Sequence, residues 1–267
     1  MATSARVLAE EPILLTGVNA GIATLTLNRP GQYNALSEDM LIALQEALDD
    51  IAGDDTIRVV VIAANGKAFC AGHDLKEMRS SEDRAFHQAL FDRCGAMMQT
   101  INNLPQPVIA KVQGIATAAG CQLVAQCDLA VAAETARFAV SGINVGLFCS
   151  TPAVPLSRNM QRKQAMQMLL TGDFIDADTA KQFGLVNEVV SPEVLDAAVS
   201  SMAEKIAAKS ALAVNLGKKM FYQQANMDLS AAYEFAGERM TCNMDSEDAR
   251  EGIDAFIEKR KPAWKGR

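Results

Sequence analysis

The sequence lacks any apolar run long enough to span a lipid bilayer. Its main apolar stretches, at residues 59–64 and 108–112, are far shorter than the roughly 20 residues of a transmembrane helix. The opening MATSARVLAEEP also lacks the apolar core of a secretory signal and reaches Glu10 and Glu11 early. We therefore expect no membrane span and a cytoplasmic location, or the mitochondrial matrix if the source is eukaryotic.

Histidines, closely paired cysteines and nucleotide-binding glycine motifs are scarce as well. The chain has 2 histidines without an HxxxH pair and 6 cysteines without a CxxC pair, so a zinc site has no support. A chain of 267 residues needs no disulfides, which indicates reduced thiols. Neither GxGxxG nor GxxxxGK[ST] occurs, so Rossmann and P-loop sites are not expected. We expect no metal and no separate cofactor.

An excess of positive charge is also missing. Lys and Arg number 25 against 32 Asp and Glu, which gives a net charge of −7 and argues against a general nucleic-acid-binding protein. Hydrophobic residues make up 49% and charged residues 21% of the chain, as is typical of globular proteins. The length suits one large domain or two small ones.

Short apolar runs alternate with amphipathic stretches in the first part of the chain. Strands are predicted at 22–27 and 57–63, the second so apolar that both of its faces should be covered. Between them, Ser37 predicts the N-cap of a helix that runs to about residue 51. The pattern then predicts a helix over 81–103, strands at 108–112 and 128–133, and a short helix opening within 116–120. This order predicts an α/β fold with parallel crossovers.

Helical patterns dominate beyond residue 160. The predicted helices cover 160–170, 177–183, 192–209, 210–226, 229–244 and 246–259, with one brief strand within 184–190. No linker-like composition separates this part from the α/β part, so we expect a shared core. The expected division is an α/β unit over residues 1–200 and a helical region over 201–267.

The segment KAFCAGHDLKEM, residues 67–78, offers one backbone donor. Cys70, Ala71 and Gly72 are small, so a ligand can approach the backbone closely and the N–H of His73 can project into a pocket. Taken alone, the segment is more simply a tight turn between a strand and a helix, with a solvated His73.

The segment VQGIATAAGCQLVAQCD, residues 112–128, offers a second donor. A helix that opens with Ala118, Ala119 and Gly120 would aim unpaired N–H groups and the positive end of its dipole at one point. Two such donors, one from each segment, are what is needed to hold the negative oxygen of a thioester enolate. Taken alone, small residues at a helix start more often indicate close packing.

The two segments at 67–78 and 112–128 resemble the enoyl-CoA hydratase/isomerase family of the crotonase superfamily. Two further motifs support the resemblance, LNRPGQYNAL before them and LLTGDFIDADTAKQFGLVNEVV after them. The resemblance runs over essentially the whole chain from residue 22, and four motifs in this order make it specific. Within the family, the sequence is similar to enoyl-CoA hydratase domain-containing proteins that lack the hydratase glutamates.

The resemblance implies a crotonase-like spiral of ββα units followed by a helical trimerisation region, in a homotrimer or a dimer of trimers. It implies an acyl-CoA partner, with CoA part of the substrate, whose thioester carbonyl lies between the N–H groups of His73 and Ala119. The residues that the resemblance places along the CoA are Gln32, Tyr33, Ala71, His73, Asp74, Leu75 and Lys76.

Hydratases of the family carry two catalytic glutamates. The first follows the oxyanion-hole residue by three positions, and the second lies about twenty positions after the first. The present sequence departs from the family at both places. Gln122 and Gly142 stand at these places. An amide does not titrate near neutral pH and glycine has no side chain, so neither residue can move a proton. We therefore expect a hydratase-like lyase whose activity is weak or absent.

Two alternatives stay open. His73 has a reference pKa of about 6.5, and the AGHD sequence also resembles CoA-dependent decarboxylases of the family, so one alternative is an acyl-CoA decarboxylase or thioesterase that uses His73. The other is a non-catalytic acyl-CoA binder. Cys149 has no evident base partner, and a reactive thiol needs an electropositive neighbour, so a nucleophilic Cys149 is not expected.

Overall fold

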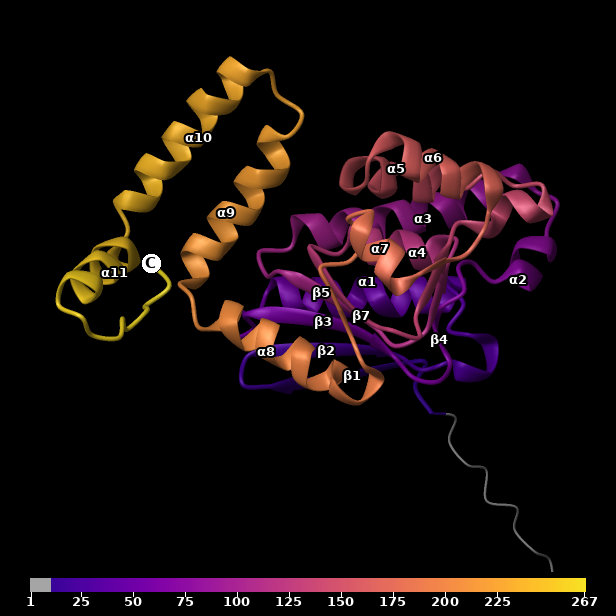
Figure 1. Cartoon of the computed structure of the whole chain (residues 1–267), viewed down its shortest axis with the longest axis horizontal. Helices are drawn as coiled ribbons and strands as arrows, with labels where there is room; N and C mark the ends of the chain where they lie inside the picture. The colour runs from indigo at the N-terminus through magenta and orange to yellow at the C-terminus, as the bar shows by residue number, and fades with distance from the viewer. Residues whose placement is uncertain (1–10) are drawn as a thin grey trace, which may run out of the picture.

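The computed structural model describes residues 11–267 and shows an α/β body from which helices α9, α10 and α11 extend as an arm (Figure 1). The strands are β1 (Leu14–Asn19), β2 (Ile22–Leu27), β3 (Val59–Ala64), β4 (Ala68–Cys70), β5 (Val108–Val112), β6 (Ile115–Thr117), β7 (Leu129–Ala133), β8 (Arg137–Ala139), β9 (Ile175–Asp176) and β10 (Glu188–Val190). The α-helices are α1 (Glu38–Ala52), α2 (Leu75–Arg79), α3 (Arg84–Asn103), α4 (Ala119–Gln126), α5 (Ser150–Asn159), α6 (Arg162–Thr171), α7 (Ala177–Gln182), α8 (Leu195–Ala207), α9 (Ala211–Gln224), α10 (Leu229–Met244) and α11 (Glu247–Ile257). Short 3₁₀ turns are η1 (Pro30–Gln32), η2 (Ser141–Val145) and η3 (Pro192–Val194).

Two sheets form the body. The main sheet has 6 strands in the order β1-β2-β3-β5-β7-β10, antiparallel between β1 and β2 and parallel at every other junction. The smaller sheet has 4 strands in the order β4-β6-β8-β9, with only the β8 and β9 pair antiparallel. Parallel strands joined by helical crossovers confirm the predicted α/β class.

Strand β3 is buried on both faces, as its uniform apolar sequence predicted. Val59 and Val61 pack with Leu195 and Val199 of α8 on one face. The alternate side chains, such as Ile62, join the large core under α1, α3 and α4 on the other face. Figure 1 shows α8 on one side of the main sheet and the remaining body helices on the other.

Side-chain caps set several helix starts. Ser37 caps α1 as predicted, because its Oγ accepts the N–H of Met40 at 3.3 Å. Helix α3 begins at Arg84 rather than at residue 81, since Asp83 accepts the N–H of Ala85 at 2.9 Å. The expected helix opening within 116–120 is confirmed at Ala119, while Ala116 still belongs to the smaller sheet, where it pairs with Phe138.

Other elements differ from the sequence predictions. Helix α5 was not predicted, because Pro152 lies in its first turn and Pro155 inside it. The single helix expected over 192–209 is η3 followed by α8. The expected division at residue 200 falls inside α8, which packs on the main sheet. Along residues 11–267, no helix combines the length and apolar character needed to cross a membrane.

A buried ion pair fastens the arm to the body. Lys218 of α9 donates from Nζ to Asp128 at 2.7 Å and to the carbonyl oxygens of Ile101 and Gln106 at 2.8 and 2.9 Å. Tyr222 donates to the other carboxylate oxygen of Asp128 at 2.8 Å. Burial lowers the pKa of Lys218, which the adjacent Asp128 opposes. Each donor and acceptor of this pair therefore has a partner away from solvent.

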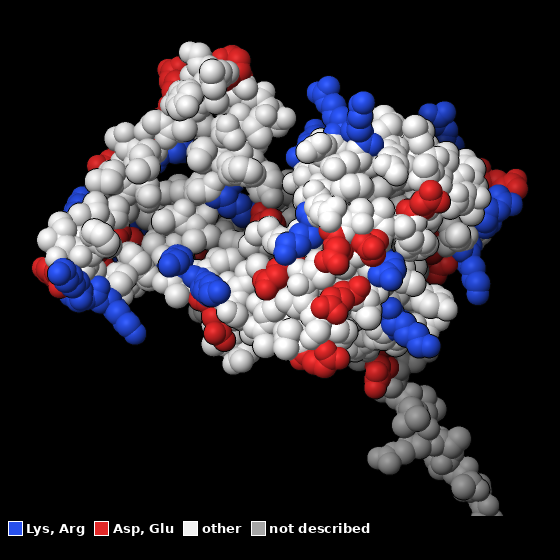
Figure 2. Space-filling model, viewed as in Figure 1, with Lys and Arg blue, Asp and Glu red and all other residues white. Residues whose placement is uncertain are grey.

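The rest of the arm exposes apolar side chains. Helix α10 has no buried residue, and Phe221, Leu229, Tyr233 and Phe256 are 61%, 76%, 74% and 85% exposed. Figure 2 shows that the visible surface of the arm is mostly uncharged, whereas both signs of charge are interspersed over the body. The exposed residues of the arm are therefore chemically suited to contact another protein surface.

Two glycines allow close approaches of backbone around the start of the smaller sheet, one of them from α4. A Cβ on Gly120 would overlap the carbonyl oxygen of Cys70, and one on Gly114 would overlap that of Lys67. Because Gly120 is the second residue of α4, the start of this helix lies directly against the chain that leaves β4.

Replacing Gly120 by alanine tests this contact. We expect Gly120→Ala to lower the free energy of unfolding by about 1–3 kcal/mol, since the added methyl forces α4 or β4 to shift; urea denaturation followed by circular dichroism measures the loss. Gly95→Ala is the matched control, because a methyl there in the middle of α3 meets nothing within 4 Å. The control should be neutral or more stable by up to about 1 kcal/mol. Equal stability of the two variants would contradict the packing argument.

Candidate active site

A cavity of about 410 Å³ opens between the β4–α2 segment, the start of α4 and the loop from β8 to α5. Its lining contains no Asp, Glu, Lys or Arg among the residues that the structure describes, and its titratable side chains are those of His73 and Cys149. The lining residues are Ala71, His73, Leu75, Met78, Phe91, Ala118, Ala119, Ser141, Gly142, Val145, Leu147, Phe148, Cys149, Ser150, Thr151 and Pro152.

Two backbone N–H groups in this lining have no acceptor within the described chain. Neither the N–H of His73 nor that of Ala119 donates to another group of residues 11–267. Ala119 is the first residue of α4, where the helix itself supplies no acceptor. The two donors are close, because a Cβ on Gly72 would lie 3.1 Å from the nitrogen of Ala119. The structure thus brings together the two segments that the sequence singled out.

Unusual backbone angles accompany both donors. Gly72 has φ +90°, and its carbonyl accepts the N–H of Leu36 at 2.8 Å, while Asp74 donates to Leu36 at 3.4 Å. Ala118 has φ 49° and ψ −122°, a conformation that is rare for a residue with a Cβ. Its N–H donates to Ala139 at 3.0 Å, and its carbonyl accepts from Gln122 at 3.0 Å. Strain held in place in this way is a common property of functional sites.

The imidazole of His73 forms part of the cavity wall. Its ring packs edge-on against Phe91, with centroids 5.5 Å apart, and neither ring nitrogen has a hydrogen-bond partner in the described chain. Burial is the main influence on this ring and lowers the pKa of His73, which favours the neutral imidazole. The simpler expectation of a solvated His73 was therefore wrong.

The sequence-predicted site residues fall into two groups. Ala71, His73, Leu75, Ala119 and Gly142 line the cavity. The others do not belong to the lining: Gln32, Tyr33, Asp74, Lys76 and Gln122.

Most residues of the second group have other contacts. Asp74 caps α2 by accepting the N–H of Lys76 at 3.0 Å, and the Lys76 side chain is exposed. Gln32 accepts from Arg29 at 2.9 Å, and Tyr33 is 58% exposed. The carbonyl of Tyr33 accepts the N–H of Ala71 at 3.0 Å, so its loop adjoins the cavity mouth. Contacts of these side chains with CoA stay a prediction.

Gln122 and Gly142, which the sequence resemblance places where hydratases carry glutamates, have different surroundings. Gln122 lies one turn after Ala119, is 3% exposed, and has no partner for Oε1 within residues 11–267. Gly142 lines the cavity, but a Cβ there would lie 2.7 Å from both the Sγ of Cys149 and the carbonyl oxygen of Leu147. Position 142 therefore has no room for a side chain unless its neighbours move.

Sequence reasoning missed the apolar wall of the cavity. Met78 and Phe91 come from α2 and α3, and Val145, Leu147 and Phe148 come from the loop before α5. Val145, Leu147 and Phe148 are 61%, 49% and 45% exposed. Apolar residues at these places carry no motif, since helix periodicity distinguishes a buried face from a solvent face but not a core from a ligand pocket.

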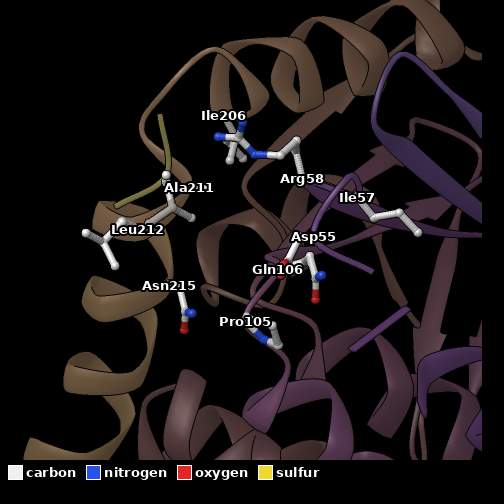
Figure 3. A pocket seen from close by; sticks show the side chains of 11 residues that line it. Asp55, Ile57, Arg58, Pro105, Gln106, Ile206, Ala211, Leu212 and Asn215 are labelled. Carbon is white, nitrogen blue, oxygen red and sulfur yellow. The ribbon is translucent and has the colours of Figure 1, made fainter. Parts of the chain in front are cut away.

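A second cavity lies between the body and the start of the arm. Its volume is about 130 Å³, and its lining includes Arg58, Gln106, Asn215 and Gly266 (Figure 3). The amide oxygens of Gln106 and Asn215 have no partner within the described residues. These are acceptors, which do not stabilise a negative oxygen, and the guanidinium of Arg58 in the same lining already donates to the carbonyl of Lys209.

Comparisons with known proteins agree with the geometry. Residues 17–267 match the family described as Enoyl-CoA hydratase/isomerase. The mitochondrial enoyl-CoA hydratase domain-containing protein 3 of Rattus norvegicus is 46% identical over 244 residues, 91% of this chain and 81% of the relative. A crystal structure of enoyl-CoA hydratase from Mycobacterium smegmatis is 59% identical, with a TM-score of 0.94 over 95% of this chain and 99% of that one. The structure of human enoyl-CoA hydratase domain-containing protein 3 is 44% identical, with a TM-score of 0.93 over 95% of this chain and 100% of that one. The chain therefore belongs to the enoyl-CoA hydratase/isomerase family and has the crotonase fold.

Proposed function

We propose that this protein binds acyl-CoA thioesters with the carbonyl oxygen between the N–H groups of His73 and Ala119. The observation that carries the proposal is this pair of adjacent, unpartnered donors at one cavity. When a thioester becomes an enolate, its oxygen turns negative, and donors already oriented in a partly enclosed site stabilise that charge without reorganising. Removing one such donor from an enzyme typically costs about 10²–10³ in rate.

Hydration needs more than this pair of donors. Addition of water to a double bond requires a group that takes a proton from water and one that gives a proton to carbon, and carboxylates usually perform both steps. The described lining of the cavity has no carboxylate. We therefore assign a hydratase-like binding geometry with weak hydration. Names of relatives, such as the 2,3-dehydroadipyl-CoA hydratase of Escherichia coli at 36% identity over 92% of this chain, support the acyl-CoA ligand class.

We extend the proposal to the oligomeric assembly and the cellular location of the protein. The apolar side chains of the arm, together with the absence of buried residues in α10, support a homotrimer or a dimer of trimers in which arms cover neighbouring chains. The word mitochondrial in the names of the rat and human relatives supports the matrix as the location if the source is eukaryotic.

The two-donor site can be tested by comparing an acyl-CoA thioester with the matching thioether, in which a methylene replaces the carbonyl. We expect the protein to prefer the thioester by about ten- to a hundredfold in affinity, as two hydrogen bonds allow. Gly72→Ala should abolish the preference, because its methyl would lie 2.8 Å from the Cβ of Ala118 and 3.1 Å from the nitrogen of Ala119. Isothermal titration calorimetry with butyryl-CoA and its thioether measures this preference in the unaltered protein and in Gly72→Ala.

Gly184→Ala is the control for backbone strain in this experiment. Gly184 has φ +84°, close to the +90° of Gly72, and lies outside the cavity lining. This variant should keep the preference for the thioester even if it loses stability. An undiminished preference in Gly72→Ala would show that the paired donors do not hold the carbonyl.

Restoring one carboxylate tests the account of weak hydration. Gln122→Glu replaces an amide by a carboxylate of nearly the same shape, and we expect hydration of crotonyl-CoA to rise about tenfold or more, measured by the loss of enoyl absorbance. Gln122→Met removes the polar group at similar volume and should give no rise. Gly142→Glu should fail to fold stably, because of the 2.7 Å approach to Cys149 and Leu147. Fast hydration by the unaltered protein would contradict the account.

A second candidate function is hydrolysis of the thioester with His73 as general base. The observation that favours it is the neutral imidazole with two unpartnered nitrogens in the same cavity as the donors. A neutral imidazole can take a proton from water as the water attacks the polarised carbonyl. Decarboxylation gains less from this arrangement, since loss of CO₂ requires no base.

Release of CoA from a panel of acyl-CoA thioesters tests this candidate. His73→Ala should abolish any release, whereas His87→Ala, which changes the other histidine, should not. Because burial lowers the pKa of His73, the base form persists below the ordinary value of about 6.5, and the rate should fall only at more acidic pH. Equal release by His73→Ala and the unaltered protein would remove His73 from the reaction.

A further inference from the structure

Cys149 occupies the space that a side chain at position 142 would need. It lies directly before α5 and lines the cavity, and its Sγ is 2.7 Å from the place of a Cβ on Gly142. Position 142 is where the sequence resemblance places the second carboxylate of a hydratase, which acts on the acyl carbons. In this chain, a thiol stands at that place in the cavity.

The other cysteines have different surroundings. Cys70, Cys94 and Cys121 are buried, and burial raises the pKa of each thiol to about 12. Cys127 is also buried, and Cys242 is exposed on α10. Within the described chain, Cys149 is the cysteine whose side chain lines the cavity that holds the two free N–H donors.

We propose that Cys149 adds reversibly to α,β-unsaturated acyl-CoA thioesters bound in this cavity, so that the protein captures 2-enoyl thioesters covalently. The proposal rests on the binding mode proposed above. A bond forms between Sγ and the β-carbon, and the π electrons of the double bond move toward the carbonyl, so that the thioester oxygen becomes the enolate oxygen between His73 and Ala119. The thiol proton ends on the α-carbon. The product is a thioether that contains all atoms of both reactants, and no oxidant or further reactant is needed.

The proposed addition depends on activation of the unsaturated thioester rather than on ionisation of the thiol. Burial raises the pKa of Cys149, which the nearby backbone of Gly142 opposes only in part, so the group is a thiol at neutral pH. The sequence argument against a nucleophilic Cys149 required an electropositive partner that lowers this pKa. Two N–H donors on the carbonyl oxygen instead withdraw electrons from the β-carbon and stabilise the charge that develops there.

The remaining lining fits this step. His73 lines the same cavity with unpartnered ring nitrogens, and in the proposed step it accepts the proton from Sγ and returns it to the α-carbon. Leu147 and Phe148 adjoin Cys149 in the chain and belong to the lining, and their apolar side chains reduce competition by water. The described residues of the lining also include no carboxylate that would activate water against the same double bond.

Intact-mass spectrometry of the full chain tests the proposal. The protein is incubated with crotonyl-CoA, quenched in acid and weighed, and parallel samples contain saturated butyryl-CoA. We expect a mass increase of a whole crotonyl-CoA, at roughly one equivalent per chain, and no increase with butyryl-CoA. Peptide mapping should place the adduct on Cys149. Cys149→Ser should lose the adduct, whereas Cys242→Ser, the control for an exposed thiol, should keep it.

The outcomes separate this proposal from the binding mode on which it rests. If butyryl-CoA binds with the expected preference over its thioether but crotonyl-CoA leaves no adduct, covalent capture is overturned and the binding mode stands. An adduct on Cys242, or one that persists in Cys149→Ser, also overturns it. If neither thioester binds in preference to its thioether, both proposals fail together.

Discussion

The site depends on one close contact between two stretches of backbone. The carbonyl of Cys70 lies where a side chain on residue 120 would have to stand, so only glycine allows α4 to begin beside the end of β4. This contact sets the distance between the two segments that carry the free N–H groups. Ala118 and Gly72, both at positive φ, turn the chain so that the first residue of α4 and His73 present their donors to the same cavity.

The backbone and the side chains of the cavity contribute different chemical groups. Its backbone provides the donors that an enolate oxygen needs, while its side chains are apolar, hydroxyl, thiol or neutral imidazole in character. Such a site stabilises negative charge on a thioester without a carboxylate to shuttle protons. In the proposed function, the family fold accordingly supports recognition of the thioester, and the outcome of the reaction would depend on His73 and Cys149. Function in this family therefore follows the few side chains around the donors more than the fold that carries them.

The sequence predicted the parts of the fold that have strong local signals. The apolar run of β3, the Ser37 cap and the long periodic helices were found because burial and capping leave direct traces in the residues. Small residues at two turns indicated backbone donors in both segments, and the family resemblance assigned them to His73 and Ala119. Helix α5 was missed because Pro155 lies inside it, where proline is unfavourable and the tertiary packing offsets the cost. The cavity walls and the approach of the Cys149 thiol to Gly142 were not predictable, since they arise from segments that meet only in the folded chain.

The anchor of the arm also bears on the helix that carries Ala119. Asp128 follows the end of α4 closely, donates no hydrogen bond, and accepts from Lys218, from Tyr222 and from the N–H of Val108 at the start of β5. Withdrawing α9 would remove the ammonium group and leave a desolvated carboxylate at the end of α4, at a cost of about 3–5 kcal/mol. The placement of the arm and the seating of α4 are thus thermodynamically linked: in the proposed assembly, neighbouring subunits that fix the arm would stiffen the far end of the helix whose first residue lines the cavity.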